Sequence, residues 1–200
     1  MEYVQHFLQK DKKLASIVRE PLPALTLQKN IPLQLMRSIM GQQLSTKVAD
    51  VIYQRFLTLC GTKNPSPKKV LTLSDEALRN IGLSYAKVTY VKNVAAYCLE
   101  HSITDTALAK HTEDAIIELL LPIKGVGRWT IEMLLMFSLA RPNVFAVDDL
   151  GIQQAMCRLY KIDATDKKAM KQRMLTISKK WEPYKTYACL HLWQWKDAAK

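Results

Sequence analysis

A short glycine-containing segment, Lys124-Gly125-Val126-Gly127-Arg128, offers the first candidate chemistry, because it lies between two apolar helical runs. Gly125 and Gly127 can adopt φ > 0 at little steric cost, so a tight turn is expected there. Such a turn leaves the amides of Gly125, Val126 and Gly127 unpaired at the start of the second helix. Free amides at the positive end of a helix dipole bind anions, and phosphate is the natural ligand. Arg128 adds a permanent positive charge beside this site.

Two neighbouring carboxylates, Asp148 and Asp149, follow farther along the chain. Asp149 precedes Leu150-Gly151-Ile152 and is expected close to a helix N-terminus, where the dipole favours its ionised form. A carboxylate there can stabilise a developing positive charge or activate a water molecule. An aspartate at such a place is also a common N-cap. Neighbours in sequence point in different directions, so one carboxylate can cap the helix while the other faces a cleft.

The composition is that of a soluble globular protein with a strong excess of positive charge. The chain has 200 residues, of which 48% are hydrophobic and 24% charged, and its net charge is +11. This length suits one domain or a compact two-lobed unit. The positive charge is compatible with a polyanionic partner, but charge alone does not separate nucleic acid from an anionic membrane or from mere solubility. Basic residues cluster near the C-terminus, where they serve either solubility or phosphate contacts: Lys167, Lys168, Lys171, Arg173, Lys179, Lys180 and Lys185.

Targeting signals and cysteine usage indicate the cellular compartment in which the protein is expected. The N-terminus shows no signal peptide, and no apolar run approaches the roughly 18 residues that span a bilayer. The cysteines lie far apart without a C-x-x-C pair: Cys60, Cys98, Cys157 and Cys189. This spacing argues against a zinc or iron–sulfur site and indicates reduced thiols in an intracellular compartment.

The hydrophobic pattern predicts an all-α protein, because apolar residues recur at helical spacing and no segment alternates as a strand does. Helices are expected over residues 3–10, 11–20, 31–41, 45–59, 74–81, 85–101, 149–160, 166–180 and 184–197, with a helix–turn–helix at about 112–138. Residues 61–67 are predicted as a loop and 104–110 as a short turn. Two helices have a predicted buried face, formed by Val48, Val51, Ile52, Phe56 and Leu59 in one and by Val88, Val91, Val94, Ala95 and Leu99 in the other.

The segment Gly125–Thr130, followed by an aspartate 20 positions after Trp129, resembles the helix–hairpin–helix DNA glycosylase superfamily. Three features resemble its alkylpurine (AlkA-like) branch, 3-methyladenine DNA glycosylase II. They are the tryptophan after Gly-Arg, the sequence Met40-Gly41-Gln42-Gln43-Leu44-Ser45 at the end of an early helix, and the aromatic segment from Trp181 to Trp193. The resemblance covers roughly residues 31–197.

This resemblance implies a two-lobed helical fold without an N-terminal β domain. One lobe is expected over residues 31–140, including the hairpin helices, and the other over 1–30 plus 141–200, with the catalytic cleft between them. The expected partner is double-stranded DNA with damaged bases, and no association with a membrane is expected. A monomer is expected, located inside the cell in the cytoplasm or nucleoid, or in the nucleus of a eukaryote.

The activity implied by the resemblance is that of a monofunctional DNA glycosylase. Such an enzyme flips out an alkylated purine of the 3-methyladenine type and hydrolyses its N-glycosidic bond, leaving an abasic site for base excision repair. The resemblance gives Asp149 the catalytic role and leaves Asp148 as cap or support. Glycosylase/lyase members carry a nucleophilic lysine near the place of Trp129, so no Schiff base is expected here.

The resemblance also implies a substrate pocket with aromatic walls. Trp129 and Trp193 match the pocket aromatics, while Met133 lies where some relatives have a tyrosine. Electron-rich rings favour an electron-poor alkylated base by stacking and cation–π attraction. Tyr53 and Phe137 are weaker pocket candidates, for which ordinary core packing is the favoured interpretation.

DNA contacts are implied at two turns. Gln43 or Leu44 would fill the space that the flipped base leaves. The hairpin contacts come from Lys124, Gly125, Val126, Gly127, Arg128 and Thr130. No iron–sulfur cluster is expected, and a structural Na⁺ or K⁺ ion would bind the backbone carbonyls of Leu121, Ile123 and Val126. Two alternatives stay open, a non-catalytic helix–hairpin–helix DNA-binding protein and a glycosylase/lyase.

Overall fold

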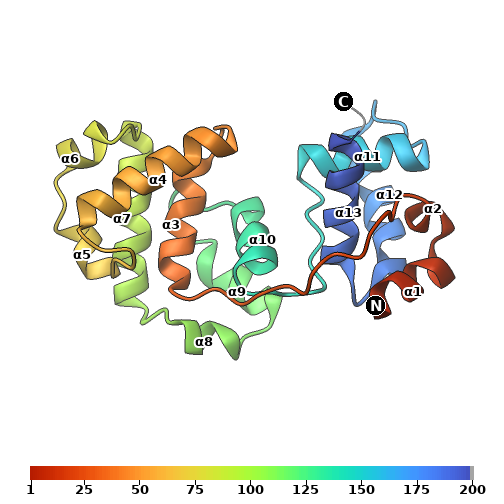
Figure 1. The fold of residues 1–200 in the computed structure, drawn as a ribbon, viewed down its shortest axis with the longest axis horizontal. Coiled ribbons are helices and arrows are strands. Elements are labelled where there is room, and N and C mark those ends of the chain that lie inside the picture. Colours follow the sequence, from red (N-terminus) through yellow and green to blue (C-terminus); the bar gives the residue numbers. More distant parts are fainter. Residues whose placement is uncertain (199–200) are drawn as a thin grey trace. The chain divides into compact units, whose positions relative to one another are not determined.

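The computed structural model describes residues 1–198, except for the side chain of Thr46. Positions 199 and 200 of the predicted second lobe lie outside the described residues. The all-α prediction is confirmed, because every regular element in residues 1–198 is a helix (Figure 1). The helices are α1 (Glu2–Lys10), α2 (Lys12–Ala15), α3 (Ile31–Gly41), α4 (Thr46–Cys60), α5 (Pro67–Leu71), α6 (Asp75–Asn80), α7 (Tyr85–Glu100), α8 (Asp105–Ala109), α9 (Glu113–Leu120), α10 (Arg128–Phe137), α11 (Leu150–Tyr160), α12 (Lys167–Ser178), the 3-10 helix η1 (Lys179–Trp181) and α13 (Lys185–Asp197).

The chain divides into two compact units. Unit 1 combines residues 1–25 with the chain from residue 141 onward, and unit 2 comprises Thr26–Ala140. Within residues 1–198, each helix is too short or too polar to cross a membrane.

Unit 2 is built around α3, which packs against α4, α7 and α10 (Figure 1). Helix α3 is apolar on most of its surface and buries Leu35, Met36 and Ile39 almost completely. Its start is fixed by side chains, since Asn30 accepts a hydrogen bond from the Leu33 amide at 3.2 Å. A buried helix needs such caps because water cannot satisfy its terminal amides.

Unit 1 is centred on α11 and α13, which pack against each other. Its core contains Trp181, which is fully buried and donates its indole N–H to Oδ2 of Asp11 at 3.0 Å. The Tyr160 hydroxyl donates to the same oxygen at 2.8 Å. Burial and the neighbouring Asp11 carboxylate raise the pKa of Tyr160 above its ordinary value. This network ties α2, α11 and η1 together, because a buried carboxylate must keep its donors.

One predicted helix end is wrong, and two short helices were not predicted. The helix predicted over residues 11–20 ends after Ala15, where the hydroxyl of Ser16 donates to the Lys13 carbonyl at 2.8 Å and competes with helical hydrogen bonding. The chain after the predicted 61–67 loop forms α5, with Ser66 as N-cap and Pro67 in the first turn. The predicted turn at 104–110 contains α8, capped by Thr104.

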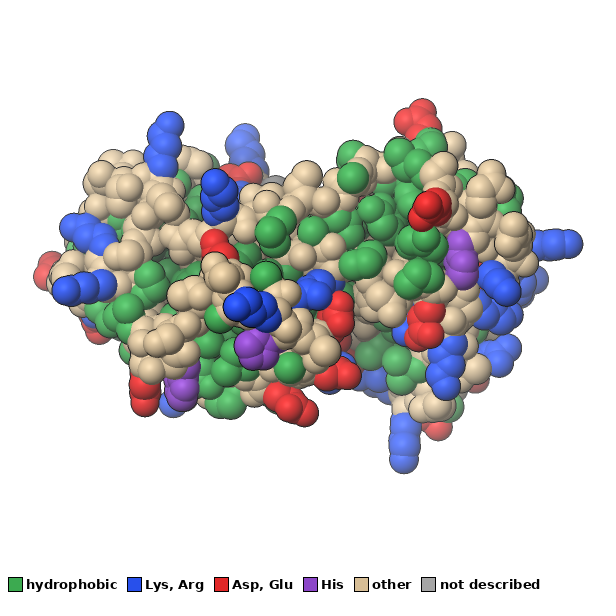
Figure 2. Space-filling view, turned by 90° about the horizontal axis from the view of Figure 1, so that it is seen from below, with side chains coloured by type: hydrophobic (Ala, Val, Ile, Leu, Met, Phe, Trp, Pro, Cys, Tyr) green, Lys and Arg blue, Asp and Glu red, His purple; other side chains and the backbone are tan. Residues whose placement is uncertain are grey.

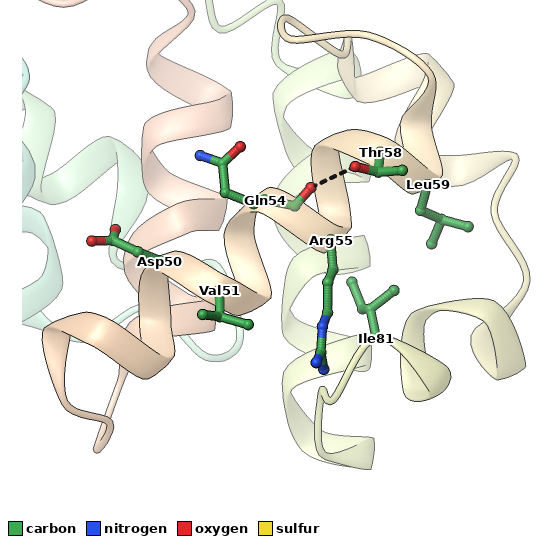
Figure 3. A pocket seen from close by; sticks show the side chains of 7 residues that line it. All are labelled: Asp50, Val51, Gln54, Arg55, Thr58, Leu59 and Ile81. Atoms are coloured by element: carbon green, nitrogen blue, oxygen red, sulfur yellow. Dashed lines mark hydrogen bonds between the residues drawn. The ribbon is translucent and has the colours of Figure 1, made fainter.

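Two predicted buried faces are also wrong in part. Val48 and Val51 are each 45% exposed and Leu99 is 47% exposed, because the inner face of α4 is formed by Ile52, Phe56 and Cys60 and that of α7 ends at Cys98. Val51 lies beside a shallow apolar groove of about 650 Å³. Figure 3 shows the side chains that line it. The groove is lined by Asp50, Val51, Gln54, Arg55, Thr58, Leu59 and Ile81.

His191 on α13 makes the stability of unit 1 sensitive to acid. Its side chain is 1% exposed, and within the described chain Nε2 has no hydrogen-bond partner. Burial lowers the pKa of His191 from 6.5 to about 4. Below pH 6.5 the unfolded chain therefore takes up a proton that the folded protein excludes, and stability falls as the pH drops from 6.5 towards 4.

We expect this single group to remove about 3 kcal/mol of unfolding free energy across that range. Urea unfolding at pH 7 and pH 4.5 measures the loss, and His191→Leu should reduce it while the exposed-site control His111→Gln leaves it unchanged. An equal acid sensitivity in all three proteins would contradict the assignment.

Candidate active site

The Asp149 carboxylate in unit 1 is held by hydrogen-bond donors from two different helices. It is the N-cap of α11, and its Oδ1 accepts the Ile152 amide at 2.9 Å. The same oxygen accepts the indole N–H of Trp193 on α13, also at 2.9 Å. Two helices thus fix one carboxylate, which stays half-buried rather than enclosed. The structure brings together two predicted site residues, Asp149 and Trp193, that are 44 positions apart.

Gly151 leaves the space in which this pair meets. A Cβ atom at Gly151 would lie 3.1 Å from Oδ1 of Asp149 and 3.1 Å from Cδ1 and Nε1 of Trp193. Sequence reasoning missed this role. The available signal was a glycine in the first turn of a helix, where glycine is unfavourable unless something requires it.

Thr186 holds the backbone that leads to Asp149. The side chain is fully buried, and its hydroxyl donates to the Arg141 carbonyl at 2.6 Å and accepts the Val144 amide at 3.1 Å. Its own amide donates to the Pro142 carbonyl at 2.9 Å. The aromatic segment that carries the family resemblance therefore clamps the connection before the aspartate, a role that spacing alone did not indicate.

Asp148 has a different environment from its neighbour. Its Oδ1 lies 2.5 Å from Nζ of Lys171 on α12, and both side chains are about 40% exposed. The expectation that Asp148 caps the helix is wrong, because the N-cap of α11 is Asp149. Asp148 is a surface ion-pair partner, worth little to stability.

In unit 2, the predicted hairpin is present between α9 and α10, with one correction. Gly125 has φ +102°, as a tight turn requires, and a Cβ there would lie 2.2 Å from the ring of Tyr90. The amide of Val126 is not unpaired, because it donates to the Ile123 carbonyl at 2.9 Å. The turn is too tight to leave all three amides open. Among the described residues, the amides of Gly125 and Gly127 have no hydrogen-bond partner.

Helix α7 braces this hairpin from one side. Tyr90 packs on Gly125, Asn93 donates to the Lys124 carbonyl at 3.2 Å, and the hydroxyl of Tyr97 donates to the Leu119 carbonyl at 2.8 Å. Sequence reasoning missed these residues, although their i, i+3, i+7 spacing places them on one helix face.

The N-terminus of α10 lacks a side-chain cap, since its N-cap is Gly127. An uncapped helix start favours an anion. Arg128 is exposed there, but its Nε also lies 3.1 Å from Oε1 of the buried Glu132, which offsets part of its charge. Thr130 is 2% exposed and accepts a hydrogen bond from Gln42. Its side chain is therefore not available for the DNA contact that was predicted.

Three predicted pocket residues form a stripe on α10. Trp129, Met133 and Phe137 are spaced i, i+4, i+8, and Trp129 and Phe137 are 38% and 49% exposed. Met133 and Phe137 line a cavity of about 720 Å³ together with Leu44. Tyr53 does not join them.

Tyr53 is 8% exposed, and the Arg37 guanidinium lies 4.6 Å from its ring centre. Burial raises the pKa of this phenol. Tyr53 is thus a packing residue of unit 2, and we remove it from the candidate pocket.

The turn between α3 and α4 presents the two predicted wedge residues. Gln43 is exposed and has φ +59°, an unusual conformation for a residue with a side chain, and Leu44 is 38% exposed. Strained backbone of this kind accumulates at functional sites.

The three hairpin carbonyls predicted to hold a monovalent cation differ in whether they already accept a hydrogen bond. The Ile123 carbonyl accepts the Val126 amide, whereas the carbonyls of Leu121 and Val126 accept no hydrogen bond from described residues. Carbonyl oxygens are suitable ligands for a hard cation, so the residues fit such an ion.

Basic side chains lie close together on the surface of unit 1, as Figure 2 shows. On α12, Lys167, Lys168 and Arg173 are exposed, while Lys171 is engaged by Asp148. Such a surface attracts a polyanion at long range without specifying its sequence.

The chain is similar to known proteins over the regions described above. A family model described as "HhH-GPD superfamily base excision DNA repair protein" matches residues 36–183. The Bacillus subtilis (strain 168) protein YfjP is 34% identical over 166 residues, which are 80% of this chain and 57% of YfjP. The chain thus spans little more than half of that relative.

Two solved structures are similar over nearly the whole chain. A DNA-3-methyladenine glycosidase from Bacillus halodurans is 35% identical with a TM-score of 0.81, covering 97% of this chain and 88% of its own. The Schizosaccharomyces pombe 3-methyladenine DNA glycosylase Mag1, in complex with abasic DNA, is 30% identical with a TM-score of 0.83, covering 97% and 96%.

Proposed function

The chain belongs to the HhH-GPD superfamily of base excision DNA repair proteins, and we propose that it is a monofunctional DNA glycosylase. It flips an alkylated purine of the 3-methyladenine type out of double-stranded DNA and hydrolyses the N-glycosidic bond, leaving an abasic site. The observation that carries this proposal is the carboxylate of Asp149, fixed by the Ile152 amide and the Trp193 indole. Similarity to two 3-methyladenine glycosylases over 97% of the chain supports it.

Asp149 acts on the sugar. When the bond between C1′ and the purine nitrogen breaks, its electron pair leaves with the base and positive charge develops on the deoxyribose. A fixed carboxylate beneath C1′ stabilises this state more than the ground state. Water then bonds to C1′ and gives its proton to Asp149 and on to solvent.

Trp193 is a positioning residue in this scheme, because its N–H orients the reacting carboxylate. Trp193→Phe keeps an aromatic face but removes the donor, and we expect a fall of about tenfold in the single-turnover rate of base release with unchanged DNA affinity. Trp195→Phe on the same helix is the matched control, since Trp195 stacks on Arg158 instead. Equal rates in the two variants would contradict the role.

The base is recognised by aromatic and apolar side chains. Trp129 and Met133 on α10 offer a polarisable surface, and an alkylated purine is electron-poor. A tryptophan face adds about 1–2 kcal/mol of cation–π attraction when water is excluded.

The DNA backbone is held at the hairpin. The uncapped start of α10 and the amides of Gly125 and Gly127 face a phosphate, with Lys124 and Arg128 supplying charge. A Na⁺ or K⁺ ion on the carbonyls of the same turn would add positive charge at that phosphate. Gln43 or Leu44 enters the base stack.

A water-based mechanism follows from the residue at the start of α10. Trp129 lies near the place where a lyase needs an amine nucleophile, and Lys124 lies in the hairpin, where we expect it to meet a phosphate instead. We therefore expect no covalent DNA adduct after borohydride treatment. A trapped adduct would favour the glycosylase/lyase alternative.

The experiment that tests the function is base release from DNA treated with a methylating agent. After the DNA is precipitated, chromatography of the supernatant should show free methylated purines. Gel electrophoresis of the DNA should show strands that break only after alkaline treatment. DNA binding without any released base would instead favour a non-catalytic binding protein, in which Asp149 serves only as the cap of α11.

A further inference from the structure

Lys87 lies outside every group assigned so far, yet it reaches the turn that carries the wedge residues. From α7, its Nζ donates to the carbonyl of Met40 at 2.9 Å and to that of Gln42 at 2.7 Å. Both carbonyls belong to the C-terminal end of α3, which has no basic residue of its own in its last turn. Lys87 therefore supplies the positive charge that a helix C-terminus prefers.

The turn needs such support because its backbone is unusual. Gln43 follows directly with φ +59°, and the Leu44 amide closes the turn on the Gly41 carbonyl at 3.2 Å. A residue with a side chain keeps a left-handed conformation only where its surroundings impose it.

A second tether acts on the same turn. Nε2 of Gln42 donates to Oγ1 of Thr130 at 3.2 Å, which joins the turn to the first turns of α10. Lys87 thus holds the backbone on either side of Gly41, while Thr130 holds the side chain of Gln42. The exposed tip, Gln43 and Leu44, is left as the part that projects.

We propose that Lys87 is a positioning residue that preorganises the Gln43–Leu44 tip for insertion into DNA. The inference rests on the proposed glycosylase function and assigns Lys87 no contact with the reacting atoms. A preformed tip fills the gap in the base stack without first ordering itself, so loss of the brace slows flipping rather than weakening the general hold on DNA.

Lys87→Met tests this, because it keeps the length of the side chain and removes the charge and the donors. We expect the single-turnover rate of base release to fall about tenfold, with affinity for undamaged duplex within about twofold of the wild type. Lys92→Met is the matched control, since Lys92 lies on the same helix but pairs with Asp75 on the surface. It should change neither quantity.

A double-variant comparison separates positioning from general destabilisation. In a protein that already carries Gln43→Ala and Leu44→Ala, Lys87→Met should cost no further activity, because the tip it positions is gone. A second tenfold fall in that background would overturn the proposal. If Lys87→Met does not fold, Lys87→Gln replaces it, since a shorter neutral side chain cannot bridge both carbonyls.

Insertion can also be read without catalysis. 2-Aminopurine beside an abasic site changes its fluorescence when a side chain enters the stack, and Lys87→Met should reduce the change while Lys92→Met retains it. Equal signals overturn the role of Lys87. If the wild type inserts but releases no base, the proposed function fails and the fluorescence result alone decides on Lys87.

Discussion

Asp149→Asn is expected to abolish most base release while leaving the protein folded and bound to DNA. Asparagine caps helices as well as aspartate does, so α11 should keep its start and the Ile152 amide its acceptor. The substitution removes the negative charge. Removing a preorganised electrostatic group typically costs a factor of at least about 100 in rate, or about 2.7 kcal/mol.

The adjacent carboxylate provides the control for this prediction. Asp148→Asn removes the same charge one residue away, but Asp148 is paired with Lys171 on the surface. Its single-turnover rate should stay within about threefold of the wild type, as surface ion pairs contribute little. Similar losses in both variants would mean that the region responds to charge in general and that Asp149 has no special role.

Gly125→Ala should destabilise unit 2 by about 3 kcal/mol or more, the largest stability effect that we expect from a single methyl group. Two costs combine. Alanine is strained at φ +102°, and its Cβ would lie 2.2 Å from the ring of Tyr90. Urea unfolding followed by circular dichroism measures the change.

The second hairpin glycine gives the matched comparison. Gly127 has φ −99°, and a Cβ there would meet nothing within 4 Å, so Gly127→Ala should cost no more than about 1 kcal/mol, the usual penalty for alanine at an N-cap. Combining Gly125→Ala with Tyr90→Ala should return part of the loss, since the overlap is relieved and the backbone strain stays. If the two glycine variants were equally stable, the packing of Tyr90 on the hairpin would not be the reason for Gly125.

Local features of this protein were predictable from sequence. The pattern of apolar residues and the glycines predicted the helices and the hairpin, because both depend on neighbours in the chain. The start of α11 at Asp149 belongs to the same class. The error at Val126 is instructive, since a turn tight enough to need Gly125 also brings that amide onto the Ile123 carbonyl.

Contacts between distant residues were not predictable from one sequence. The hydrogen bond from Trp193 to Asp149 joins two helices, and no spacing rule relates their positions. The same holds for Tyr90 on Gly125 and for Lys87 on the wedge turn. The prediction that Val48 and Val51 are buried was wrong for a related reason. Apolar periodicity identifies a helix face but does not tell whether another element covers it.

A cap and a catalytic carboxylate are compatible in one residue. The hydrogen bonds from the Ile152 amide, in its own helix, and from the Trp193 indole, on α13, both fall on Oδ1 of Asp149. They fix the direction of the group, as a reacting carboxylate requires, and Gly151 supplies the necessary room. The sequence presented capping and catalysis as alternatives, whereas the geometry allows one to support the other.

The central claim is that Asp149 stabilises positive charge on the sugar, and binding of a charged sugar analogue tests it most directly. Two duplexes are compared, one with a cationic pyrrolidine in place of the damaged nucleoside and one with a neutral tetrahydrofuran of the same shape. We predict that the wild type binds the cationic duplex at least about 100-fold more tightly, and that Asp149→Asn loses this preference while it still binds the neutral duplex. Equal preference in the wild type and Asp149→Asn would contradict the account.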